Sequence, residues 1–95
     1  MNFEWDDDKN AANLAKHGIA FEEAATIFDG EYLSVEDRRI DYGELRLTTL
    51  GRLAGEVIIV VVHTDRDERI RIISARKANK TERQVFNDHY DQSKI

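Results

Sequence analysis

Apolar residues near the start of the chain recur at helical spacing and are bounded by helix end signals. Residues 6–17 (DDDKNAANLAKH) predict a first helix, because acidic residues stand at its start and Lys16 and His17 in its last turn. Gly18 is placed to end it. The apolar side of this helix is thin, so Trp5 is expected to help cover it.

A second helix is predicted over residues 21–28 (FEEAATIF) and ends at Asp29-Gly30. Its apolar positions follow the i, i+3, i+4, i+7 stripe of a core-facing helix: Phe21, Ala24, Ala25 and Phe28. A final helix is predicted to start near Asn79 or Thr81. The segments N-x-x-E and T-x-x-Q that begin at these two residues both resemble capping boxes.

Between these helices the pattern changes to that of β-strands. Four strands are predicted, over residues 32–36 (YLSVE), 45–50 (LRLTTL), 57–63 (VIIVVVH) and 69–76 (RIRIISAR). The first is short and suits an edge, whereas the third is apolar on both faces and suits a central strand covered on both sides. The connections GRLAGE and TDRDE are short enough for antiparallel hairpins and too short for crossovers.

This order of elements predicts an α+β fold. Two N-terminal helices and a C-terminal helix are expected to pack on an antiparallel meander of about four strands, in one domain that spans residues 1–95. The last strand raises a question, because alternation places Ile70, Ile72, Ser74 and Arg76 in one row. An arginine at the end of a row that starts in the core either contacts a ligand or pairs with a local acid.

Composition narrows the function classes. The chain has 95 residues, a net charge of −5 and no cysteine, so a disulfide framework and thiolate chemistry are excluded. The longest apolar run, VIIVVV, is far shorter than a membrane span, and the acidic N-terminus lacks a signal peptide's features, so a cytoplasmic location is expected. The first 37 residues hold ten acids against two lysines, and the rest hold twelve Lys and Arg against nine acids, which permits an anionic ligand at one end.

The residues available for chemistry are mainly arginines, histidines and a glutamate at strand ends. No nucleotide-binding or hydrolase motif is present, and the three histidines lack metal-ligand spacing, so neither a cofactor nor a metal is expected. Arg46 and Arg76 could bind phosphate if strand order and register brought them together. The competing interpretation is that each arginine forms an ion pair with a nearby acidic residue. From the residues alone, phosphate binding and local ion pairing are about equally weighted for Arg76.

Several further side chains have both a structural and a functional interpretation. Glu44 precedes Arg46 by two residues, so the pair is either a salt bridge or a base beside a phosphate clamp. His17 suits a helix C-terminus, and His63 suits a half-buried structural role at the end of the central strand. Trp5 is a stacking platform for a base or, more commonly, part of the core.

Two blocks of sequence resemble the BrnT family of bacterial type II toxins. These are KHG-x-x-FEEA, from residue 16, and RIISAR-x-A-x-x-x-ER, from residue 71, and the similarity extends from about residue 3 to residue 83. The resemblance implies a small ribonuclease with a RelE-like fold that blocks growth by cutting RNA. It also implies a BrnA-like antitoxin with a ribbon-helix-helix domain, so that DNA is contacted only through the antitoxin.

By matching blocks, the resemblance implies a catalytic set of His17, Glu44, Arg46 and Arg76. Lys16, Arg66 and Lys80 are then candidates for RNA binding. RNA can be cut by its own 2′-hydroxyl, so this chemistry needs no metal. The two catalytic arginines would stabilise charge on the phosphate, and Glu44 or His17 would transfer protons.

The sequence departs from the family pattern in the segment before Glu44. Many relatives carry a histidine there, and this chain has RRIDYG. The alternative function is therefore a catalytically inactive toxin-like module that acts only through protein–protein binding. The apolar central strand and the thin first helix leave room for a homodimer or for burial by a partner.

Overall fold

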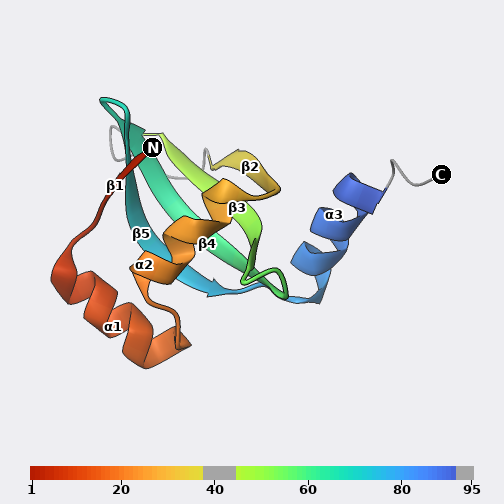
Figure 1. Ribbon diagram of the computed structural model, residues 1–95, viewed down its shortest axis with the longest axis horizontal. Helices are drawn as coiled ribbons and strands as arrows, with labels where there is room; N and C mark the ends of the chain where they lie inside the picture. Colours follow the sequence, from red (N-terminus) through yellow and green to blue (C-terminus); the bar gives the residue numbers. More distant parts are fainter. Residues whose placement is uncertain (38–44, 92–95) are drawn as a thin grey trace.

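The apolar runs after residue 31 form four antiparallel strands, and a short N-terminal strand completes the sheet. The computed structural model describes residues 1–37 and 45–91. The strand order is β1-β5-β4-β3-β2, and among the described strands only the β1–β5 pair is parallel (Figure 1). The strands are β1 (Asn2–Glu4), β2 (Tyr32–Asp37), β3 (Arg46–Leu53), β4 (Val57–Arg66) and β5 (Arg69–Lys77).

The predicted positions of the strands are confirmed. β2 lies at an edge, and β4 lies in the centre with apolar side chains buried on both faces. On one face Ile59 and Val61 join the core under the N-terminal helices, and on the other Ile58 and Val60 join a second core under the C-terminal helix. β1 is a fifth strand that the sequence pattern did not indicate, because three residues are too few to show alternation.

The first helix, α1 (Asp7–His17), begins and ends where the sequence predicts. The Asp6 carboxylate caps it by accepting hydrogen bonds from the backbone N–H groups of Asp8 and Lys9, at 2.9 and 3.1 Å. Gly18 has φ 73° and donates its N–H to the Leu14 carbonyl at 2.9 Å, the left-handed ending that favours glycine.

The second predicted helix is divided in two. An α-helical turn, α2 (Phe21–Ala24), continues as a 3₁₀ segment, η1 (Ala25–Asp29). Ile27 of η1 lies against Gly51 of β3, where a β-carbon added to the glycine would be only 2.7 Å from the Ile27 Cβ. The close approach of η1 to the sheet therefore depends on the absence of a side chain at Gly51.

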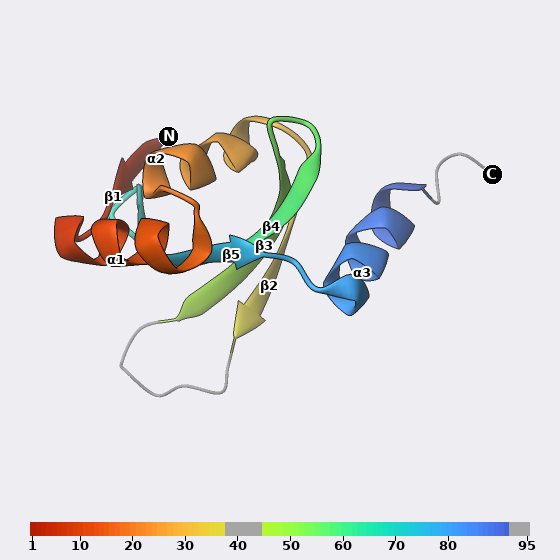
Figure 2. The same ribbon diagram turned by 90° about the horizontal axis from the view of Figure 1, so that it is seen from below.

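The C-terminal helix, α3 (Lys80–Asp91), lies on the opposite side of the sheet from α1 and α2 (Figure 2). Asn79 and Glu82 form the capping box that the sequence suggested, with reciprocal backbone bonds of 2.8 and 2.9 Å. Phe86 is fully buried against the sheet, and the Tyr90 hydroxyl donates to the Tyr32 carbonyl. Among the described residues, no helix has both the length and the apolar character needed to cross a membrane.

A β-bulge in β5 corrects the predicted row of residues 70 to 76. Val62 pairs with Ser74 and His63 with Ile72, so Ile73 is an extra residue without its own partner on β4. Ala75, rather than Ser74, therefore joins Ile72 in the core under α1 and α2. The prediction that Arg76 ends the row of Ile70 and Ile72 is wrong, because the bulge moves Arg76 to the face that carries α3.

Candidate functional site

The sheet face opposite α1 and α2 carries a strip of half-buried residues that the three helices leave open. Thr48, Val62 and Ser74 lie in register across β3, β4 and β5. Two residues further along β4, towards the C-terminal helix, Val60 lies under α3. Since side chains two positions apart share a face, this strip lies between the α3 core and the end of the sheet that carries Arg46.

One end of the strip is bounded by Arg46. This residue pairs with Thr64 of β4, and Arg66 follows two positions later on the same strand. Both arginines therefore lie at the same end of the sheet, and both have interaction partners. Glu44, the predicted acid or base, lies outside the described residues.

The other end is bounded by Arg76, whose guanidinium forms two parallel hydrogen bonds of 2.8 Å with the Glu82 carboxylate. These bonds raise the pKa of Arg76 and lower the pKa of Glu82. The Arg76 side chain is nevertheless 43% exposed. Lys80 begins α3, two residues before Glu82, and its side chain is also exposed.

The structure does not bring Arg46 and Arg76 together on one phosphate. Arg76 pairs with Val60 and Arg46 with Thr64, so the two arginines are offset by four residues along β4 and lie on opposite sides of it. At about 3.3 Å per residue the offset is roughly 13 Å, before the separation between strands is added. A single phosphate cannot bridge that span, whereas a short RNA segment can contact both side chains.

The last turn of α1 lies along the edge of β5. Because β1 pairs only as far as Arg71, none of the described strands lies beside Ala75 on the edge of β5 that faces away from β4. The Asn13 amide fills this role, since it accepts from the Ala75 N–H at 3.1 Å and donates to the Ala75 carbonyl at 2.8 Å. His17 follows Asn13 by one helical turn, so it lies on the same side of α1, towards the strand edge that precedes Arg76.

His17 is half-buried and Lys16 is exposed. Within residues 1–37 and 45–91, neither side chain has a hydrogen-bond or ion-pair partner.

The prediction that Trp5 is part of the core is supported, because its ring packs edge-on against Phe21 at 6.2 Å. Sequence reasoning missed Asn13, for which the only signal was the thin apolar side of the first helix.

A second polar arrangement lies on the helix-covered face. His63 is only 2% exposed and contacts Thr49 through Nε2 at 2.7 Å and Asp65 through Nδ1 at 2.9 Å. Thr49 in turn contacts the Ser34 hydroxyl at 2.7 Å. The structural role expected for His63 therefore includes a network of four side chains. Its signal in the sequence was the His-x-Asp spacing, which places both side chains on one face of a strand.

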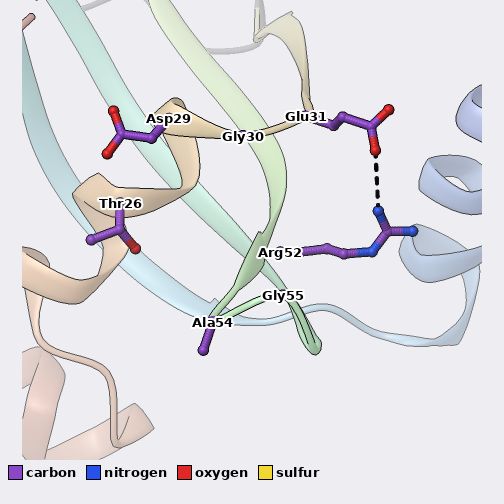
Figure 3. A pocket seen from close by; sticks show the side chains of 7 residues that line it. All are labelled: Thr26, Asp29, Gly30, Glu31, Arg52, Ala54 and Gly55. Atoms are coloured by element: carbon purple, nitrogen blue, oxygen red, sulfur yellow. Dashed lines mark hydrogen bonds and ion pairs between the residues drawn. The ribbon is translucent and has the colours of Figure 1, made fainter.

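A cavity of about 560 Å³ lies beside the β3–β4 turn, away from all of these residues (Figure 3). It is lined by Thr26, Asp29, Gly30, Glu31, Arg52, Ala54 and Gly55. Arg52 extends towards Glu31, at 3.4 Å (Figure 3). Its guanidinium also lies 4.9 Å from the centre of the Phe86 ring. The cavity contains the carboxylates of Asp29 and Glu31, and its one guanidinium already pairs with Glu31. It is therefore poorly suited to a phosphate group.

No three histidine, aspartate or glutamate side chains gather at metal-binding geometry in the part of the chain that the structure describes. The candidate site residues that the structure describes form two groups, which lie on the sheet face that carries α3 and along the β5 edge of the sheet. Arg46 and Arg66 lie at one end, and Arg76, Lys80 and the last turn of α1 lie towards the other. This spread is suited to an extended anionic ligand.

Comparison with known proteins shows the family of this chain. A family model described as "Ribonuclease toxin, BrnT, of type II toxin-antitoxin system" matches residues 5–82. The crystal structure of the ribonuclease toxin BrnT from Brucella abortus is similar, with a TM-score of 0.63 and 28% sequence identity over 84% of this chain and 99% of that chain. A comparison with curated protein sequences gives no match. The chain thus belongs to the BrnT family of ribonuclease toxins of type II toxin–antitoxin systems.

Proposed function

We propose that this toxin cuts RNA without a metal ion, on the sheet face bounded by Arg46 and Arg76. Membership of the BrnT family supports RNA as the substrate. The observation that supports the site is that both arginines lie on one sheet face, with the open strip of Thr48, Val62 and Ser74 between them. An RNA backbone laid along this strip would place different phosphates at the two guanidinium groups.

The proposed reaction uses the RNA's own 2′-hydroxyl. A base removes the proton from the 2′-oxygen, which attacks the adjacent phosphorus while the bond to the 5′-oxygen breaks. An acid protonates that leaving oxygen, and the first product ends in a 2′,3′-cyclic phosphate. The protein must therefore supply a cation at the phosphate and one or two proton-transfer groups, each typically worth ~10²–10⁴-fold in rate.

Arg46 would stabilise charge on the reacting phosphate, and Glu44, two residues earlier in the sequence, would transfer a proton. Arg76 would hold a neighbouring phosphate while Glu82 fixes its orientation. His17 lies at the β5 edge, near the Arg76 end, and is the second candidate for proton transfer. Lys16, Arg66 and Lys80 would contact the RNA on either side of the strip.

The proposed partner is a basic antitoxin of the BrnA type, with a ribbon-helix-helix domain through which the complex contacts DNA. Family membership implies an antitoxin. The acidic N-terminal region, which holds ten acids in its first 37 residues, is complementary to a basic partner. RNA cleavage would take place in the cytoplasm, where the substrate is found.

The test is induced expression in a bacterial host of the wild type beside Arg76→Ala, with growth and total RNA followed together. Arrest with RNA decay in the wild type alone supports the proposal. Purified protein should also cut RNA in the presence of EDTA, and loss of cleavage on chelation would contradict the metal-free reaction. Intact RNA with well-expressed wild-type protein would instead favour the inactive, protein-binding module.

A further inference from the structure

Both ends of the hydrogen-bond network around His63 reach the same cavity. Ser34 and Asp65, the two ends of the network, both line a cavity of about 330 Å³ on the helix-covered face. Its two inner members, Thr49 and His63, are 0% and 2% exposed. Two apolar side chains in place of Thr49 and His63 could fill the same interior space and would need no hydrogen-bond partners. Packing alone therefore does not explain why polar residues occupy these positions.

The proton positions in this network follow from Asp65. An ionised carboxylate can only accept, so Nδ1 of His63 donates to Asp65. In the tautomer with its single ring proton on Nδ1, Nε2 accepts from the Thr49 hydroxyl. The Thr49 oxygen then accepts from the Ser34 hydroxyl. Ser34 is left with oxygen lone pairs for the cavity, and Asp65 with its second carboxylate oxygen. The network therefore presents acceptors to the cavity.

The remaining walls are largely apolar and partly aromatic. They include Phe28, Tyr32, Leu47 and Ile70, and the charged residues Glu68 and Arg69 complete the polar part of the lining. The rings of Phe28 and Tyr32 lie 5.3 Å apart, and Phe28 meets the His63 ring edge-on at 5.2 Å, which fixes both walls relative to each other. A matching ligand has a flat ring that packs against aromatic side chains and an edge with N–H donors. A nucleobase has both features.

We propose that this cavity binds one unpaired nucleobase of the RNA, an inference that rests on RNA being the substrate of the proposed function. The volume of about 330 Å³ is at the lower end of the ~300–1,000 Å³ typical of small-ligand sites. Leu47 lines the cavity, and its neighbour Arg46 projects to the opposite face. An RNA strand that crosses this end of β3 can place a base in the cavity and a phosphate at Arg46.

The test uses small probes that cannot be cut. The ¹⁵N-labelled protein is titrated with the four ribonucleoside 5′-monophosphates and, separately, with ribose 5-phosphate, and amide chemical shifts are followed by NMR. At least one monophosphate should bind and shift the signals of Ser34, His63 and Asp65, whereas ribose 5-phosphate should not. Ser34→Ala should weaken binding about tenfold, the effect of one lost hydrogen bond.

Thr26→Ala is the matched control, because the exposed Thr26 hydroxyl donates to the Glu23 carbonyl and Thr26 does not line this cavity. Binding of ribose 5-phosphate at the same amides would overturn the proposal in favour of an anion site. No binding by any monophosphate, or equal binding by Ser34→Ala and the wild type, would also overturn it. Because the probes contain no internucleotide bond, binding without RNA cleavage would contradict the proposed function and leave the nucleobase site supported.

Discussion

Arg76 and Glu82 join the end of β5 to the first turn of α3 through two hydrogen bonds of 2.8 Å. Glu82 also accepts from the Asn79 N–H, so one carboxylate serves both the helix cap and the arginine. This arrangement gives Arg76 a structural role as well as the proposed contact with RNA. The two roles can be separated by substituting each partner of the pair.

Arg76→Ala is expected to abolish RNA cleavage, because it removes a cation from the phosphate path. It should lower the free energy of unfolding by only about 1 kcal/mol, since the ion pair is partly exposed. Glu82→Gln keeps the cation and weakens the same pair. If Glu82→Gln loses activity to the same extent while both variants remain folded, cleavage depends on the intact ion pair and not on the cation of Arg76 alone.

The same pair predicts how stability depends on pH. Hydrogen bonds from Arg76 hold the pKa of Glu82 below its usual 4.5, so the unfolded chain binds more protons in this range. The contribution of Glu82 to stability is therefore complete above the usual value and is lost as the pH falls through the folded-state pKa. In urea unfolding, the difference between wild type and Glu82→Gln should shrink below about pH 4.5. A difference that grows on acidification would contradict this assignment.

Gly51→Ala is expected to destabilise the fold. The new methyl group would lie 2.7 Å from the Ile27 Cβ, so η1 must move away from β3, at a cost of about 1–3 kcal/mol. Gly30→Ala is the control, because a β-carbon added there would have nothing within 4 Å and the φ of −114° suits alanine. Thermal unfolding of the two variants side by side measures the effect, and equal melting temperatures would show that η1 does not rest on Gly51.

Thr49→Val should lower stability by about 1–3 kcal/mol, because it leaves the buried Nε2 of His63 without a hydrogen-bond partner. Ser34→Ala, at the exposed end of the network, should cost less than half as much. Urea unfolding of both variants tests this order. The reverse order would indicate that the network is held from the Ser34 end and not from the buried histidine.

Local sequence signals determined most of the secondary structure. The Asp6 cap, the Gly18 ending and the Asn79–Glu82 capping box act through backbone groups within a few residues, so they could be identified without the fold. The run VIIVVV in β4 indicated a central strand in the same way, because consecutive apolar residues place apolar side chains on both faces of the strand. The family resemblance rested instead on the two sequence blocks that begin at residues 16 and 71.

Only the tertiary structure decided which side chains meet. The extra residue Ile73 reverses the alternation of β5, and nothing in a run of apolar and basic residues marks where such a bulge falls. It moved Arg76 from the predicted core row to the open face. Strand register then separated Arg46 from Arg76, and Asn13 replaced a missing strand beside Ala75, over 62 positions of sequence. Contacts at such separation depend on the packing of the whole sheet, which no local pattern records.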